Sequence, residues 1–229
     1  QDPMASLDPL FSIYDQVGEP AYHHRRLRRN SLKTRVEELL GMVRIPSPSI
    51  RMKEFPHQMS GGMRQRIVGA MALAGGPKLI VADEPTTNLD VTIQLQYLEL
   101  LKELQDQTGV ALIFVTHNLG IVAKMCNQIA VMYAGKIVEQ GTTRDIFNQP
   151  QHPYTDALLK SIPVLGNKDP LYVIPGQPPN LAEPPDGCLF HPRCPKADQR
   201  CRVEHPPEVV LQNAQSSVCW MTHKEQQLV

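Results

Sequence analysis

Two neighbouring carboxylates follow a short apolar run at residues 79–85, which read LIVADEP. A carboxylate at the end of a buried strand costs free energy unless something such as a metal ion requires it. Asp83 is suited to hold Mg²⁺, directly or through water, because hard cations prefer oxygen ligands. Glu84 should point the other way and could orient or deprotonate a water for attack on a phosphate. The alternative is an exposed acidic pair at a strand-to-loop junction, without chemistry.

A glycine-rich turn at residues 59–66, MSGGMRQR, is a second candidate site. Gly61 and Gly62 stand at an expected helix start, where free backbone N–H groups and the helix dipole attract anions. Ser60 adds a hydroxyl donor. By itself the pattern is also compatible with an ordinary glycine-containing helix start.

Four of the five cysteines form a third candidate site near the end of the chain; they are Cys188, Cys194, Cys201 and Cys219. A structural zinc site prefers cysteine pairs separated by two to four residues, and no such pair occurs here. The irregular spacing is compatible with an iron–sulfur cluster, while zinc and free thiols remain alternatives. Cys126 is expected to be a buried apolar residue, and His191, His205 and His223 are expected to be loop residues.

The elements that must position these residues alternate between apolar strands and amphipathic helices. Helices are predicted at 31–43, 60–75, 91–106, 118–126 and 143–148, and strands at 78–83, 110–116, 128–134 and 135–141. This alternation predicts an α/β fold with a parallel sheet covered on both faces. Because prolines become dense after Pro150, we expect a first domain at 1–150, with a helical subdomain at about 10–75, and a mostly irregular module at 151–229.

Composition narrows the class of protein. The chain has 229 residues with 23 basic and 23 acidic side chains, so no overall signal for nucleic acid exists. No segment approaches the ~20 apolar residues of a membrane span, and no signal peptide opens the chain. A cytoplasmic protein is expected, which a partner could hold at a membrane.

Taken together, the motifs resemble those of the ATP-binding-cassette (ABC) ATPases, a family of P-loop NTPases. The similarity rests on their order and spacing: the signature motif at 59–63, the Walker B segment LIVADEP, the D-loop TTNLD at 86–90 and the switch segment FVTHNL at 114–119. Gln1 resembles the glutamine of the Q-loop. No G-x-x-x-x-G-K-[S/T] phosphate loop (Walker A) occurs, so the chain is expected to be a fragment that begins at the Q-loop.

The resemblance implies ATP and Mg²⁺ as ligands. It makes Asp83 a Mg²⁺ ligand, Glu84 the catalytic base and His117 the sensor of the terminal phosphate. Gln1 would contact the metal, and Asp90 would end the D-loop. In the family two such domains meet head to tail, so Ser60, Gly61 and Gly62 would clamp an ATP held mainly by a second, related but non-identical ATPase subunit.

The segment QHPYTDALLKSIP at 151–163 resembles ATPase subunits of oligopeptide and dipeptide importers, a group that includes nickel importers; Asn88 stands where that group more often has alanine. The resemblance implies peptide uptake at the cytoplasmic face of a prokaryotic membrane. Its partners would be two transmembrane permeases and, indirectly, an extracellular binding protein, and the four cysteines would hold a [4Fe–4S] cluster. Nickel import and a soluble, non-transport ABC ATPase are the alternatives.

Overall fold

The computed structural model describes residues 2–87, 89–163, 166 and 170–222. These residues form two compact units, Gln1–His117 and Asn118–Val229. The division differs from the boundary expected near residue 150. Each unit is considered separately below.

The first unit contains helices and one pair of strands. Its elements are α1 (Pro3–Ser6), α2 (Ile13–Arg25), α3 (Arg29–Met42), α4 (Pro48–Arg51), the 3₁₀ helix η1 (Pro56–Gln58), α5 (Gly61–Ala74), β1 (Leu79–Asp83), α6 (Val91–Thr108) and β2 (Ala111–Val115). The helices predicted at 31–43, 60–75 and 91–106 are thus confirmed, as are both strands. The periodicity analysis missed α2.

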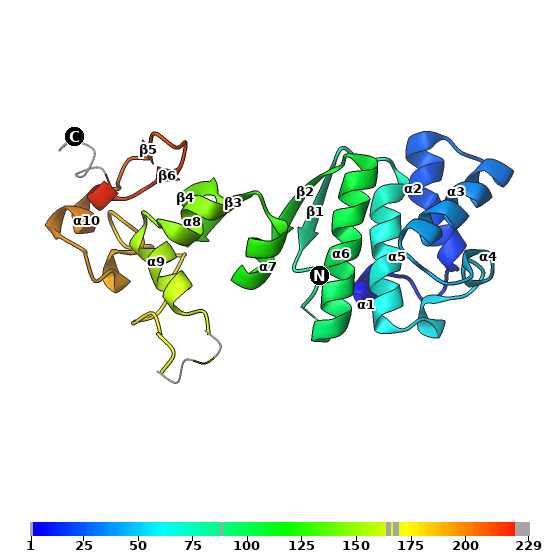
Figure 1. The fold of residues 1–229 in the computed structure, drawn as a ribbon, viewed down its shortest axis with the longest axis horizontal. Helices are drawn as coiled ribbons and strands as arrows, with labels where there is room; N and C mark the ends of the chain where they lie inside the picture. Colours follow the sequence, from blue (N-terminus) through cyan, green and yellow to red (C-terminus); the bar gives the residue numbers. More distant parts are fainter. Residues whose placement is uncertain (1, 88, 164–165, 167–169, 223–229) are drawn as a thin grey trace. The chain divides into compact units, whose positions relative to one another are not determined.

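Helices α2, α3 and α5 pack around an apolar core in the region expected to be a helical subdomain (Figure 1). Helix α2 begins with a capping box, in which the Ser12 hydroxyl accepts from the Asp15 amide at 3.2 Å and the Asp15 carboxylate accepts from the Ser12 amide. Apolar side chains three and four positions apart then face the core. Those that are completely buried are Ile13, Val17, Ala21, Val36, Leu39, Leu40, Ile67, Ala70 and Ala74.

Strands β1 and β2 run parallel, with Leu79 opposite Ala111 and Asp83 opposite Val115. Helices α5 and α6 lie side by side on one face of this pair (Figure 1), and together with β1 they line a cavity of about 120 Å³. The sequence predicted helices on both faces of the sheet, but the other face of this strand pair is partly exposed in the described structure. It carries four apolar side chains that are each about half exposed, namely Leu79, Val81, Ile113 and Val115.

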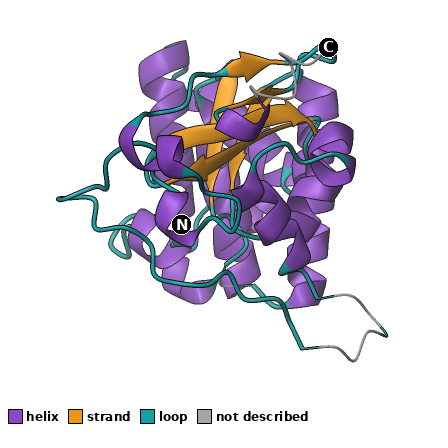
Figure 2. Cartoon of the chain, turned by 90° about the vertical axis from the view of Figure 1, so that its left-hand side faces the viewer, coloured by secondary structure: helices purple, strands orange, loops and turns teal. Residues whose placement is uncertain are grey.

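The second unit combines short helices with an antiparallel sheet. Its elements are α7 (Leu119–Met125), β3 (Gln128–Tyr133), β4 (Lys136–Thr142), α8 (Thr143–Asn148), α9 (Pro153–Lys160), the 3₁₀ helix η2 (His191–Arg193), α10 (Gln199–Val203), β5 (Val209–Val210) and β6 (Ser216–Ser217). The described part of 161–190 has no regular structure, as expected for this proline-rich region; such loops are teal in Figure 2.

The strand predicted at 128–134 lies in a second, antiparallel sheet and not in the parallel pair. The antiparallel sheet has the order β3-β4-β6-β5. The turn between β3 and β4 explains the difference, because its two residues, Ala134 and Gly135, have φ angles of 50° and 77°. A two-residue loop with both φ angles positive joins antiparallel strands.

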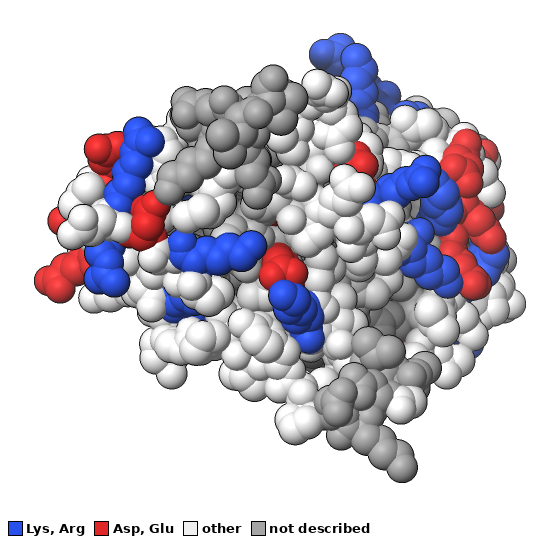
Figure 3. Space-filling view, turned by 60° about the vertical axis from the view of Figure 1, so that its left-hand side comes forward, with Lys and Arg blue, Asp and Glu red and all other residues white. Residues whose placement is uncertain are grey.

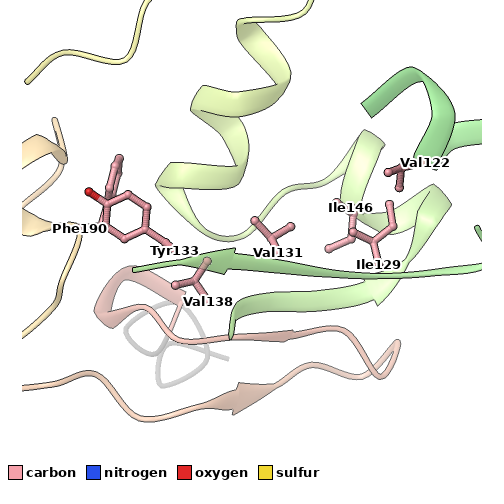
Figure 4. Close-up of a cluster of buried hydrophobic side chains, with 7 residues drawn as sticks. All are labelled: Val122, Ile129, Val131, Tyr133, Val138, Ile146 and Phe190. Carbon is pink, nitrogen blue, oxygen red and sulfur yellow. The ribbon is translucent and has the colours of Figure 1, made fainter. Parts of the chain in front are cut away.

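An aromatic and aliphatic cluster forms the core of the second unit (Figure 4). The ring of Tyr133 at the end of β3 meets the Phe190 ring edge-on, with 5.1 Å between centroids. Tyr154 of α9 packs against both rings, at 4.6 and 5.3 Å. Tyr154, the tyrosine of the segment HPYT at 152–155, therefore packs against this core and attaches α9 to the sheet.

Glu139 connects residues on both sides of the expected boundary. Its buried carboxylate accepts hydrogen bonds from the backbone amides of Gln151 (2.6 Å) and His152 (3.0 Å) and from the Gln215 side chain (2.7 Å). Strand β4 also pairs with β6. Because a buried charge must be fully hydrogen-bonded, these contacts make residues 118–150 and the end of the chain one unit.

Acidic and basic side chains are interspersed on the face shown in Figure 3, in keeping with the equal numbers of each. Across the described residues, no helix combines the length and apolar character required for a membrane crossing.

The pH dependence of folding should report on His152, which caps α9 by accepting from the Tyr154 amide at 3.0 Å. Burial lowers the pKa of His152 from 6.5 to about 4. Unfolding restores the ordinary pKa, so stability is lost as pH falls from 6.5 toward 4, by about 3 kcal/mol. His152→Asn keeps a capping oxygen without titrating, and urea unfolding should show a flatter pH profile.

His205→Asn, which changes an exposed histidine of the same unit, is the matched control and should keep the wild-type profile. An unchanged pH dependence in His152→Asn would contradict the assignment.

Candidate functional site

The predicted carboxylate pair lies where β1 ends. Asp83 is the last residue of the strand, and Glu84 follows with a φ angle of 43°. This left-handed conformation is uncommon for a residue other than glycine, and such residues concentrate at functional sites. The backbone therefore turns sharply after Asp83, and the Glu84 amide donates to the Val115 carbonyl at 2.8 Å.

The structure brings Glu84 and His117 together, although they are far apart in sequence. Glu84 Oε1 lies 2.9 Å from His117 Nδ1, and the Thr87 hydroxyl donates to Glu84 Oε2 at 2.9 Å. Both carboxylate oxygens are thus held, one by each neighbour. Thr87 is a site residue that the motif comparison did not single out.

These two hydrogen bonds determine the ionisation of Glu84. The bond to His117 is the largest cause that lowers its pKa, and the bond to Thr87 is the next. Glu84 is consequently a carboxylate at neutral pH, which can accept a hydrogen bond from a water molecule. The His117 side chain is 77% exposed, which leaves its second ring nitrogen accessible.

The glycine-rich turn forms the start of α5. Ser60 is the N-cap, and its hydroxyl accepts from the Met63 amide at 3.3 Å. A side chain at Gly62 would approach Ile93 of α6 to 3.1 Å, so helix packing accounts for this glycine. A side chain at Gly61 would meet nothing within 4 Å. The exposed backbone at Gly61 is therefore open to a ligand.

Two other predicted residues have a local role or lie outside the described residues. Asp90 is the N-cap of α6, where one oxygen accepts from the amides of Thr92 and Ile93 at 3.0 Å. The hydrogen bonds of Ser60 and Asp90 in the described chain stay within their own helix starts, so neither residue reaches Glu84. Gln1, like Asn88, is not among the described residues.

The second unit brings the four predicted cysteines around one small cavity, which His152, Phe190, His191 and Trp220 also line. Cys126, as expected, lies elsewhere, packed against the apolar cluster. The described side chains include no group of three or more His, Cys, Asp or Glu already arranged to hold a metal ion. The four cysteines share one cavity.

Local contacts explain how the cysteine-bearing segments come together. The Cys188 amide donates to the Cys201 carbonyl at 2.9 Å. Gly187 permits this approach because a side chain there would lie 2.5 Å from the same carbonyl oxygen. Next to Cys201 and Cys219, the Arg200 guanidinium stacks on the Trp220 ring, 3.4 Å from its centroid.

Burial determines the protonation of these thiols. It is the largest cause that raises the pKa of Cys188 and of Cys201, and it raises that of Cys194 to about 11. Neighbouring thiols add to the effect, because each disfavours a second negative charge nearby. Without a metal, Cys188, Cys194 and Cys201 are therefore neutral thiols at neutral pH.

Two of the three histidines that were expected in loops lie within hydrogen-bond distance of a backbone carbonyl oxygen. The ring of His191 lies beside the cavity, and its Nδ1 is 3.0 Å from the Cys188 carbonyl oxygen. His205 Nδ1 lies 2.9 Å from the Pro206 carbonyl oxygen. His223 is outside the described residues.

Comparison with a solved structure and with protein families identifies the class of protein. The solved structure of cbiO1 from Clostridium perfringens, part of the ABC transporter complex cbiONQ, superposes with a TM-score of 0.57 at 29% identity; it covers 65% of this chain and 57% of that one. The fold is the α/β fold of ABC ATPases, as predicted. Residues 3–87 match the ABC transporter family, and residues 138–201 match the oligopeptide/dipeptide transporter C-terminal region.

Similar proteins with curated names identify the group within this family to which the chain belongs. Dipeptide transport ATP-binding protein DppD of Bacillus subtilis is 49% identical over 222 residues, which are 96% of this chain and 66% of the relative. The oligopeptide transport protein OppD of B. subtilis is 47% identical (98% and 63%), and DppD of Escherichia coli is 46% identical (96% and 67%). The chain belongs to the ABC transporter ATP-binding proteins of the oligopeptide/dipeptide group. It spans about two thirds of the length of these relatives.

Removal of the His117 imidazole should change the ionisation of Glu84. In His117→Ala the pKa of Glu84 should rise toward its ordinary value, because the largest cause of its depression is gone. Thr87→Val should give a smaller rise. A ¹³C NMR titration of the Glu84 carboxyl group measures both. His57→Ala, at another histidine of the same unit, is the control; a Glu84 pKa that His117→Ala leaves unchanged would refute the interaction.

Proposed function

We propose that this protein is the ATP-binding and ATP-hydrolysing subunit of an ABC importer that takes up di- or oligopeptides. The observation that carries the proposal is the fixed Glu84–His117 pair at the end of β1, in a member of this family. The names of the similar proteins, which refer to dipeptide and oligopeptide transport, support peptides as the transported class.

The chemistry we infer is attack of water on the terminal phosphate of ATP. Glu84 would orient the water and accept its proton, since its carboxylate is ionised and both of its oxygens are held in place. The exposed ring of His117 would contact the terminal phosphate. Asp83 offers carboxylate oxygens for Mg²⁺, which when bound would neutralise charge on the phosphates.

The start of α5 would serve a different nucleotide. We infer that Ser60, Gly61 and Gly62 contact an ATP held mainly by a second ATPase subunit, packed head to tail. The open backbone at Gly61 and the positive end of the 14-residue helix α5 support this role, because both favour phosphate oxygens. Asp90 and Gln1 remain proposed contacts to nucleotide or metal.

The same proposal assigns the partners and the location. Two membrane-embedded permeases would bind the ATPase pair at the cytoplasmic face of a prokaryotic membrane, and an extracellular binding protein would deliver the peptide. ATP-driven closing of the pair would bias the permeases between inward- and outward-facing states. Membership of the peptide-transport group supports these assignments.

We also propose that the four-cysteine cavity binds a [4Fe–4S] cluster, with Zn²⁺ as the alternative. The donors fit in type and number, since Cys188, Cys194, Cys201 and Cys219 all line one cavity. Because burial raises the pKa of Cys188, Cys194 and Cys201, binding would displace protons from these thiols. A bound cluster would cross-link loops that otherwise have a small apolar core.

ATP hydrolysis tests the catalytic assignment. In the full-length subunit assembled with its permeases, Glu84→Gln keeps the size of the side chain and removes its basicity. ATP hydrolysis should fall by about 10²- to 10⁴-fold while ATP binding persists. Uptake of labelled dipeptides into proteoliposomes should fall in parallel. Glu99→Gln, at an exposed glutamate of α6, should keep wild-type rates, and undiminished hydrolysis in Glu84→Gln would refute the role of Glu84.

Metal analysis of anaerobically purified protein tests the cysteine site. We expect iron and acid-labile sulfide in equal amounts, and their loss in Cys194→Ser. Cys126→Ser removes the cysteine outside the cavity and should keep both. Zinc without sulfide would favour the alternative metal, and absence of any metal from the wild-type protein would leave four free thiols and refute the site.

A further inference from the structure

The backbone conformation of Glu84 requires an explanation that the catalytic assignment does not supply. Its φ angle of 43° is left-handed, and the next residue is Pro85. Left-handed backbone at a non-glycine residue is strained and persists only where the surroundings impose it. The position of the Glu84 carboxylate therefore depends on whatever holds this turn.

Hydrogen bonds from both neighbouring helices hold the turn. The buried side chain of Gln65, on α5, donates from Nε2 to the Pro85 carbonyl at 2.9 Å. On α6, Gln94 donates from Nε2 to the Thr86 hydroxyl at 3.0 Å. The Thr87 amide closes the turn on the Glu84 carbonyl at 3.3 Å. Of the two side-chain bonds from the helices, that from Gln65 acts nearer to Glu84, on the carbonyl of the next residue.

Gln65 has a second buried side chain as its neighbour. Tyr97 of α6 is 5% exposed and lines the same cavity as Gln65. Burial raises the pKa of Tyr97 to about 12, so its hydroxyl keeps its proton at neutral pH, and the neighbouring Gln65 has a smaller, lowering influence. Gln65 thus holds Pro85 from a buried position beside α6.

We propose that Gln65 is a positioning residue for catalysis: through the Pro85 carbonyl it maintains the left-handed turn that presents Glu84. It contacts neither water nor nucleotide. The proposal rests on the proposed ATPase function for its catalytic consequence, whereas the mechanical role follows from the contacts alone. Loss of the side-chain amide leaves a buried carbonyl without its partner and releases the turn.

Gln65→Met tests the proposal, because methionine has nearly the shape of glutamine without its hydrogen bonds. Amide hydrogen exchange at Glu84, Thr87 and Leu89 should become about tenfold faster, while exchange in the middle of α6 stays unchanged. Gln107→Met, at an exposed position of α6, is the matched control and should exchange like the wild type. Tyr97→Phe removes only a hydroxyl and should give a smaller increase at the same amides.

Steady-state kinetics of the assembled, full-length transporter supply the catalytic readout. Gln65→Met should lower kcat for ATP hydrolysis about tenfold and leave KM for ATP unchanged, because the turn positions Glu84 and not the nucleotide. A general loss of structure would instead reduce the folded fraction and accelerate exchange throughout the unit.

Two results would overturn the proposal: exchange in Gln65→Met that equals that of Gln107→Met, or accelerated exchange with unchanged kcat. If Gln65→Met does not fold, Tyr97→Phe decides by the same two readouts. If the wild-type transporter does not hydrolyse ATP, the proposed function fails, and the exchange comparison alone decides whether Gln65 holds the turn.

Discussion

The parallel pairing of β1 with β2 is the constraint on which the first unit depends. Its register places Asp83 opposite Val115, so the residues that follow both strands emerge at the same edge of the sheet. Glu84 and His117 can therefore form a 2.9 Å contact. A shift of one residue would turn each side chain to the opposite face and separate the pair. Ligands of open α/β sheets bind at this edge for the same reason.

Helix α5 connects two tasks within the first unit. Its start carries Ser60 and Gly61, which are exposed, and its next turn carries Gln65, which is buried and hydrogen-bonded to the Pro85 carbonyl. A helix is a stiff element, so these positions cannot move independently. The proposed contact to a neighbouring subunit's nucleotide and the turn that presents Glu84 thus belong to one rigid body.

The second unit depends in the same way on one set of polar contacts, the hydrogen bonds of the buried Glu139 side chain. Glu139 ties β4 to the start of α9 and to the loop before β6, and the HPYT segment adds a capping histidine and a core tyrosine. These contacts explain why the compact units divide at residue 117 and not near residue 150, where the composition changes. The change in composition at Pro150 is real, but the contacts that join the two sides are long-range.

The sequence predicted most helices and strands, because apolar periodicity reports directly on which face is buried. Through a motif order typical of one family it also pointed to Glu84 and His117 as site residues, but their 2.9 Å contact came from the structure. It predicted neither the strain at Glu84 nor the roles of Thr87 and Gln65. A glutamine in a helix shows no sequence pattern that distinguishes an exposed side chain from a buried one that holds a neighbouring turn.

By itself, the sequence determined the family, the α/β class and the residue types available for chemistry, since these are local properties of composition and spacing. Only the tertiary structure decided that the strand at 128–133 pairs antiparallel, that four scattered cysteines line one cavity, and that Gln65 reaches Pro85. Each of these depends on a contact between distant segments, which forms only when burial and hydrogen bonding of the whole unit are satisfied together.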